Sequence, residues 1–555
     1  MSQRQVIARS RRRARAAASI VLDRGAAPAS RFGGRGALLS GTALAALVAC
    51  GLFGFSDRAL AQAGATLPTG GVVVGGSATI TQSGTSQLTI NQTTDRGVID
   101  WRSFSIGQGN RVDFIQPGST SVTLNRVTGP DPSLIAGRLT ANGQIVLINQ
   151  AGVMFAGGAQ VNVESLIAST ANVANPQAFM AGGKIAFDQA GANPNARIVN
   201  DGTITVRDGG LVALLGPSAA NNGVINARLG RVTIGGAETF TVDLNGDGLL
   251  NFVVGKPVSQ TPRDADGKAL ALASNTGTIN ANGGVVAITA SAARGVVDGV
   301  VNVQGQINAR TVTNEGGVIV FGGGESTQVN VGGTTDVSGA GATQKGGTVS
   351  VTASKVSVQS TARINANGGA GGGTVLVGGG KQGAGPIANA KNTSVAKGAI
   401  ITADATYKGN GGTVIIWADN TTVFAGTISA KGGPQGGHGG FAEVSGKIYL
   451  SFDGVVDLRA TDGFQTGTLL LDPSDITISN SADSNIDPSG GDPNTITGTA
   501  NASNIKASTI EGLLPTANVI VDAAGGAGAG TGSITVNENI VAATTNTLTF
   551  NALTD

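Results

Sequence analysis

One five-residue unit recurs along the chain and constrains the fold more than any other feature. A small residue, usually glycine, is followed two positions later by isoleucine and four positions later by alanine or valine. The units are Gly202–Val206, Gly223–Ala227, Gly277–Ala281, Gly305–Ala309, Ala362–Ala366 and Gly426–Ala430. A glycine pair and a second Val- or Ile-rich run usually follow. Such self-similarity indicates a repeat architecture.

The alternation within each unit predicts a short strand with isoleucine and alanine on one face. The first two units are 21 residues apart, which fits one coil of three short strands and three turns. A narrow coil interior also explains the low aromatic content of 4%. We therefore predict an all-β fold, a right-handed, single-stranded parallel β-helix over residues 62–475. Antiparallel β-sandwiches are the alternative, and they need larger core residues.

A β-helix predicts which residues face the interior and which face outward. The intervening Thr203, Thr205, Thr278 and Asn280 should face outward, and asparagines at turns can form hydrogen-bonded ladders along the stack. Helical periodicity is confined to two short stretches, 165–170 and 507–514. The central isoleucines should be buried: Ile204, Ile225, Ile279, Ile307, Ile364 and Ile428.

The first 61 residues differ in charge from the rest of the chain. They contain ten of the 36 basic residues and two of the 34 acidic residues. Arginines precede an apolar run at 37–55, and the small residues Ala59 and Ala61 frame a cleavage site. Residues 1–61 are therefore predicted to be a signal peptide, cleaved after Ala61. A retained signal anchor, or a lipoprotein acylated at Cys50, is the alternative.

The chain that follows the signal is mildly acidic, with 26 basic and 32 acidic residues. This balance argues against nucleic acid as a partner, because phosphate binding needs a clustered basic face. Cys50 is the only cysteine, so the cleaved chain has neither a disulfide nor a thiol nucleophile. The only histidine, His438, lies in a glycine-rich turn. A Ser-His-Asp triad is therefore not expected.

Four stretches between residues 97 and 149 carry a family resemblance. They are Gly97–Gly107, Val112–Pro117, Leu124–Gly129 and Asn142–Asn149. In this order and spacing they resemble the haemagglutination-activity, or two-partner secretion, domain of filamentous haemagglutinin-like exoproteins.

The resemblance implies a domain organisation along the chain. Residues 62–300 are assigned to the β-helical secretion domain, and residues 301–475 to continuing glycine-rich β-helix repeats. Residues 476–555 are expected to form a further β-rich segment, and the strand-like end of the chain suggests a fragment of a longer exoprotein.

The resemblance also implies a function. The chain would reach the periplasm and cross the outer membrane through a dedicated β-barrel partner transporter. It would act outside the bacterium, without catalysis, as a secreted or surface-displayed adhesin that binds an unidentified receptor on a host or neighbouring cell. A β-helical polysaccharide-active enzyme and the stalk of a contact-dependent toxin lacking its tip are the alternatives.

Four residues in or directly after the matching stretches are assigned to the secretion motif: Asn125, Arg126, Asn149 and Gly152. The family usually reads Asn-Pro-Asn-Gly where this chain has Asn149-Gln150-Ala151-Gly152. The outer asparagine and glycine are kept, and these two residues favour a tight turn.

One further motif resembles the start of a calcium loop. Asp243, Asn245, Asp247 and Asn251 have the D-x-N-x-D-G-x-x-N spacing of oxygen ligands that suits Ca²⁺. The twelfth position, which should be a bidentate glutamate, is Val254. A polar hairpin tip between strands at 240–242 and 252–254 is the alternative. No other cofactor is expected.

Overall fold

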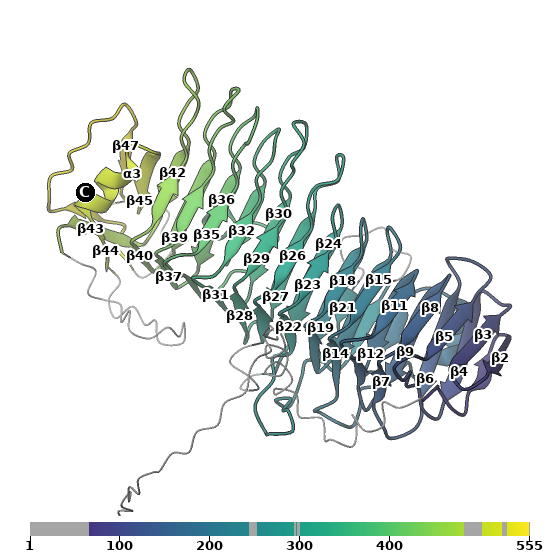
Figure 1. Ribbon diagram of the computed structural model, residues 1–555. Helices are drawn as coiled ribbons and strands as arrows, with labels where there is room; N and C mark the ends of the chain where they lie inside the picture. The colour runs from purple at the N-terminus through teal and green to yellow at the C-terminus, as the bar shows by residue number, and fades with distance from the viewer. Residues whose placement is uncertain are drawn as a thin grey trace, which may run out of the picture. The chain divides into compact units, whose positions relative to one another are not determined.

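Three long sheets, each with one strand from nearly every coil, form the framework of the protein (Figure 1). The computed structural model describes residues 66–243, 252–293, 296, 300–481, 502–523 and 530–553. Predicted features outside these residues, including Ala59, Ala61, Asn245, Asp247 and Asn251, receive no structural account. Successive coils pair in parallel, which confirms the predicted parallel β-helix.

The first sheet has sixteen strands among the described residues. In spatial order they are β1 (Val72–Gly75), β4 (Arg96–Trp101), β6 (Val122–Val127), β9 (Gln144–Asn149), β12 (Ser165–Ser169), β16 (Leu211–Gly216), β19 (Arg231–Gly236), β24 (Val285–Ala290), β27 (Val318–Gly323), β30 (Thr348–Thr352), β33 (Thr374–Val377), β36 (Thr413–Ala418), β39 (Phe441–Gly446), β42 (Thr468–Leu471), β45 (Asn518–Asp522) and β47 (Leu548–Asn551).

The second sheet has fourteen strands in the same part of the chain. They are β2 (Ala78–Ser83), β3 (Gln87–Gln92), β5 (Arg111–Ile115), β8 (Arg138–Ala141), β11 (Gln160–Val163), β15 (Thr203–Val206), β18 (Val224–Asn226), β23 (Thr278–Asn280), β26 (Gln306–Asn308), β29 (Thr334–Asp336), β32 (Arg363–Asn365), β35 (Ile400–Thr402), β38 (Thr427–Ser429) and β41 (Val455–Asp457).

The third sheet has eleven described strands. They are β7 (Ser133–Ile135), β10 (Val153–Phe155), β14 (Arg197–Asn200), β17 (Ser218–Asn221), β22 (Ala273–Asn275), β25 (Val301–Val303), β28 (Gln328–Val331), β31 (Lys355–Val358), β34 (Asn392–Val395), β37 (Thr421–Phe424) and β40 (Tyr449–Phe452).

Shorter elements complete the described fold. One small sheet contains β13 (Ile185–Phe187), β20 (Phe240–Val242) and β21 (Phe252–Val254); another contains β43 (Asp475–Ser479), β44 (Ala502–Lys506) and β46 (Ile534–Val536). The helical elements are α2 (Pro176–Ala181), α3 (Ala507–Leu513) and the 3₁₀ turn η1 (Lys381–Gly383).

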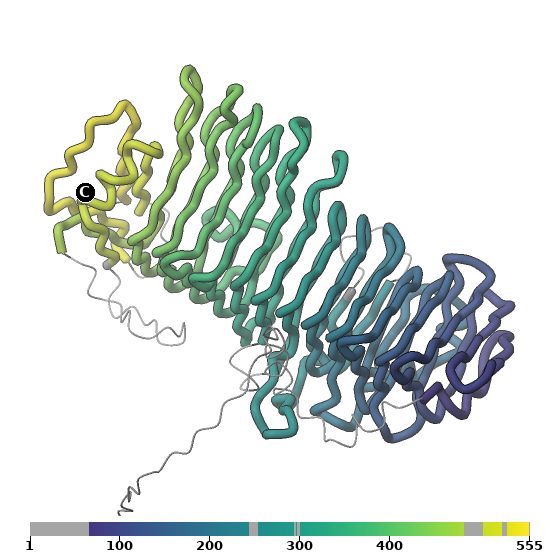
Figure 2. The backbone as a smooth tube through the Cα atoms, viewed as in Figure 1, coloured from purple at the N-terminus to yellow at the C-terminus, as the bar shows by residue number. Residues whose placement is uncertain are grey.

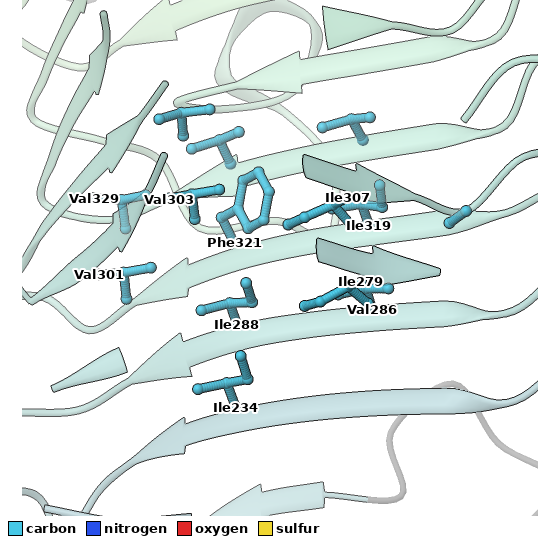
Figure 3. Close-up of a cluster of buried hydrophobic side chains, with 14 of the residues drawn as sticks. Ile234, Ile279, Val286, Ile288, Val301, Val303, Ile307, Ile319, Phe321 and Val329 are labelled. Atoms are coloured by element: carbon cyan, nitrogen blue, oxygen red, sulfur yellow. The ribbon is translucent and has the colours of Figure 1, made fainter. Parts of the chain in front are cut away.

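The recurring isoleucines form one buried column inside the coils. Ile204, Ile225, Ile279 and Ile307 pair in register through β15, β18, β23 and β26. All six predicted isoleucines are at most 1% exposed, so their predicted burial is confirmed. Figure 3 shows Ile279 and Ile307 beside Ile288 and Phe321 in this core. Thr203 is exposed and Thr205, Thr278 and Asn280 are half-buried on the opposite face, as predicted.

The N-terminal end of the β-helix is closed by antiparallel pairing. β1 runs antiparallel to β4, and β2 folds back antiparallel on β3. A bare strand edge presents unpaired N–H and C=O groups that can template aggregation. The two antiparallel strands cover that edge of the first coil.

A second apolar cluster lies on the outer face of the first sheet. Leu124, Val146 and Ile167 point away from the coil interior and pack with Phe179 of α2 and Phe240 of β20. Strand alternation explains this arrangement, because their neighbours in sequence fill the interior. The small β13–β20–β21 sheet and α2 thus cover the early coils.

Two helical expectations had opposite outcomes. The helix predicted near residue 507 is confirmed as α3. The helix predicted at 165–170 is wrong, because residues 165–169 form the buried strand β12, paired in parallel with β9 and β16. A short apolar run fits either a buried helix or a buried strand, and pairing with neighbouring coils decides. Helix α2, begun by Asn175 and Pro176, was not predicted.

Replacing Ile279 with aspartate tests whether this position faces the apolar interior of the β-helix. Ile279 is fully buried, so an unpaired carboxylate there should destabilise the local coils by several kcal/mol. Hydrogen exchange across residues 270–310 should show the loss of protection. Thr278→Asp, one residue away on the outward face, is the matched control. Equal protection in the two variants would contradict the predicted orientation.

Candidate functional site

The four stretches that carry the family resemblance form the first coils of the β-helix. They contribute β4, β5, β6 and β9, which lie in neighbouring positions of two sheets. Asp100 and Arg126 are register partners on β4 and β6. Arg126 donates through Nε to Asp100 Oδ1 at 2.7 Å and through Nη2 to Oδ2 at 2.8 Å. This two-bond geometry joins adjacent coils on their outer side.

Asn125 points into the coil, although its neighbours in the core are apolar. Its register partners Ile99 and Leu147 belong to the core, and Asn125 itself is fully buried. The indole Nε1 of Trp101 donates to Asn125 Oδ1 at 3.0 Å, and Asn125 Nδ2 donates to the Val146 carbonyl at 3.3 Å. A buried indole needs a partner for its N–H. Asn125 therefore provides the acceptor that lets Trp101 occupy the interior.

Asn149 and Gly152 form the turn between β9 and β10. Asn149 is 1% exposed, and its Oδ1 accepts from the Ala151 N–H at 2.9 Å. Its Nδ2 donates to the Asp131 carbonyl and to Ser133 Oγ, each at 3.0 Å. Gly152 has a φ of 117°, where side chains are rarely tolerated. The structure thus gives both residues a folding role, and their role in secretion stays a prediction.

A buried amide network in the same coils was not predicted from the sequence. Thr123 Oγ1 donates to Gln92 Oε1 at 2.6 Å and accepts from Gln116 Nε2 at 3.0 Å. At the edge of this network the exposed side chain of Asn142 exchanges two hydrogen bonds of 2.8 Å each with the backbone of Gln116. The signal available in the sequence was the occurrence of Gln, Thr and Asn at ends of strands in successive coils.

Asparagine ladders connect later coils, as the sequence predicted. Inside, Asn200 Nδ2 donates to Asn221 Oδ1, and Asn221 Nδ2 donates to Asn275 Oδ1, both at 2.7 Å. All three residues are fully buried. Outside, Asn280 accepts from Asn308 at 2.8 Å and donates to Asn226 at 3.0 Å. Asn280 is therefore a ladder member and not a freely solvated surface residue.

Only one of the four predicted calcium ligands lies among the described residues. Asp243 follows β20, and the other three predicted ligands lie outside the described residues. β20 and β21 pair antiparallel, which is the hairpin expected around this motif. Across the described ranges, no three His, Cys, Asp or Glu side chains are grouped so that they could hold a metal ion. The described helices are all too short or too polar to cross a membrane.

Two buried carboxyl groups lie under the η1 turn in the later coils. Glu443 of β39 is fully buried, and the Gln382 N–H donates to its two oxygens at 2.9 and 3.1 Å. Burial raises the pKa of Glu443 to about 7, and nearby Asp472 adds to the rise. Burial, followed by repulsion from Asp522, raises the pKa of Asp472 to about 6. Lys381 opposes the shift of Glu443 only in part.

The structure therefore contains a parallel β-helix with a closed N-terminal end and polar connections between its first coils. This architecture defines the class of parallel β-helix proteins. Residues 65–337 match the family described as "TPS secretion domain". The chain therefore carries a two-partner secretion domain over these residues.

Individual relatives agree with this assignment. The chain is 36% identical to a heme/hemopexin-binding protein of Haemophilus influenzae over 184 residues, which are 32% of this chain and 20% of that protein. A second H. influenzae protein of that name is 45% identical over 95 residues, 17% of this chain and 10% of that protein. The alignments thus span no more than a fifth of these relatives.

A solved structure shows the same fold. The HMW1 secretion domain of Haemophilus influenzae superposes with a TM-score of 0.58 at 28% identity. The superposition covers 71% of this chain and 99% of that domain.

The pKa of Glu443 predicts how stability depends on pH. Its folded-state pKa, about 7, lies above its ordinary value of 4.5. The folded state therefore holds the proton more tightly, and stability should fall as pH rises from about 4.5 to about 7. Glu443→Gln should unfold at a similar temperature at pH 4 and be more stable than the parent at pH 8, by roughly 3 kcal/mol. The exposed Asp453→Asn is the control. A melting profile of the Glu443→Gln variant with the parent's pH slope would contradict the buried-acid assignment.

Proposed function

We propose that this protein is a non-catalytic adhesin-type exoprotein, exported by an outer-membrane β-barrel partner and displayed on or released from the cell. The observation that carries the proposal is the set of family stretches at 97–149, which form the connected first coils within the matched secretion domain. The partner transporter, the receptor on a host or neighbouring cell and the location outside the bacterium are parts of this proposal.

The fold suits export in an unfolded state. Each coil makes its main contacts with the coil before and after it, so folding can propagate along the stack. Folding outside the membrane would oppose backward movement of the chain. The Asp100–Arg126 pair and the Asn125–Trp101 bond join the first coils, so these coils can provide the stack with its first stable template.

A binding role is favoured over catalysis by the chemistry of the described residues. Glu443 and Asp472 are the carboxyl groups with strongly raised pKa values, and both are buried under the η1 turn. A glycosidase needs its two carboxyl groups to flank an accessible substrate bond. No cofactor is required for the proposed function. The binding recorded in the relatives' names is not transferred, since the alignments cover so little of those proteins.

Export should depend on the partner transporter. Deleting the partner gene should remove the protein from the medium and the cell surface and leave it in the periplasm. Immunoblots of cell fractions, with a periplasmic marker and an unrelated secreted protein as controls, measure this. Undiminished secretion without the partner would contradict the proposed route.

The turn formed by Asn149 and Gly152 should be needed for recognition or early folding. Substituting both with alanine removes the acceptor for the Ala151 N–H and places a Cβ within 2.9 Å of the Arg197 carbonyl oxygen. The double variant should accumulate in the periplasm and be degraded there. Ala151→Ser, in the same turn, is the control. Normal external amounts of the double variant would refute the assignment.

A further inference from the structure

Three stacked loops in the later coils project beyond the sheets and form what we call the glycine fin. The fin comprises residues 403–412, 430–440 and 458–467, which connect the second sheet to the first. Figure 2 shows such loops extending from the green coils. Backbone hydrogen bonds join them: Gly433 N–H to the Gly409 carbonyl, Gly409 N–H to the Gly436 carbonyl and Gly439 N–H to the Gln465 carbonyl, each 2.9 Å.

Glycine allows the loops to approach this closely. A Cβ atom placed on Gly437 would overlap the carbonyl oxygen of Gly409, and one on Gly409 would overlap the carbonyl oxygen of Ala370. Both overlaps would be with backbone atoms, which cannot be relieved by a change of side-chain rotamer. The fin is thus a backbone-bonded platform and not a set of independent loops.

Two aromatic rings are exposed on this platform. Tyr407 is 51% exposed and Phe464 is 44% exposed, whereas most other described aromatic side chains are buried. The Phe464 ring lies against Gly436 and makes an edge contact with His438 at a centroid distance of 5.3 Å. Neither ring contributes to the interior core. Because these rings are exposed on a fixed backbone, we expect them to bind a ligand and not to stabilise the fold.

Polar groups surround the rings without giving the fin a strong charge. Lys431 pairs with Asp404, and Arg459 pairs with Asp457 at the base of the fin. The other charged residues of the three loops are Lys408 and Asp462, which have opposite signs. A polyanion would need a basic surface, which these loops do not provide.

His438 contributes a hydrogen-bonding group beside Phe464. Its Nδ1 accepts from the Gln465 N–H at 3.1 Å. In the neutral ring, Nε2 then carries the proton and is a donor. Gln435 and Gln465 are exposed amides in the same loops. The fin therefore combines apolar ring faces with neutral donors and acceptors.

We propose that the glycine fin binds a neutral, extended β-linked polysaccharide. The loops that carry Tyr407 and Phe464 are two coils apart, so their backbones are roughly 10 Å apart along the stack at the usual strand spacing. That separation is comparable to the distance between alternate sugar rings in such a chain, and the C–H faces of sugars pack on aromatic rings. A protein partner would need a larger continuous interface than two rings on loops provide. This inference extends the proposed surface role by naming a class of receptor.

Binding of the full secreted protein to insoluble polysaccharides tests the proposal. Cellulose and chitin are the β-linked probes, starch granules the α-linked probe and immobilised heparin the polyanion. We expect binding to cellulose or chitin that persists in high salt. Tyr407→Ala with Phe464→Ala should weaken it at least about tenfold, because both stacking contacts are lost.

Matched variants separate recognition from folding. Tyr407→Phe keeps the ring and should bind within about twofold of the parent. Val455→Ala removes an exposed apolar side chain, 60% exposed, from β41 outside the fin loops and should bind normally. Thermal unfolding of all variants should match the parent, because the altered side chains are exposed.

Three results would overturn the inference: no binding to cellulose or chitin, equal binding by the double variant, or preferential salt-sensitive binding to heparin. The partner-deletion experiment is independent of these assays. Its failure would remove the export route and leave polysaccharide binding by the isolated protein unaffected.

Discussion

Parallel, in-register pairing between successive coils is the constraint on which the rest of this structure depends. It places each residue directly above the equivalent residue of the preceding coil, at a spacing of roughly 4.8 Å. Ile204, Ile225 and Ile279 stack because of it. The same register aligns Asn200 with Asn221 and Asn275, so buried amides can satisfy one another. An isolated buried amide would lack such partners and would be costly.

The sequence predicted those parts of the fold that repeat. Ile279 could be placed inside and Thr278 outside, since strand alternation and recurrence agreed at that unit. Ser165–Ser169 was misjudged because a short apolar run has no internal feature that separates helix from strand, and its two parallel neighbours lie far away in sequence. Helix α2 and the outer cluster around Phe179 also depend on long-range packing.

The candidate site was predictable in position and less so in chemistry. The resemblance identified Asn125 and Arg126, but only the coordinates show that Asn125 faces Trp101 in the core while Arg126 faces Asp100 outside. Glu443 could not be recognised from sequence, because its raised pKa depends on the η1 turn, which starts more than sixty residues earlier and covers it. Local sequence patterns specify strands. The burial of Glu443 by the η1 turn depends instead on contacts between segments that are distant in sequence.

The antiparallel closure by β1 and β2 makes the N-terminal end of the β-helix different from the coils that follow it. The coils from β7 to β41 contribute parallel strands to all three sheets. Whole coils can therefore be gained or lost in evolution without changing how the stack begins. The length of the β-helix can then change in steps of roughly 4.8 Å, one coil at a time. The distance between a cell and whatever the protein touches can thus vary independently of the part that directs its export.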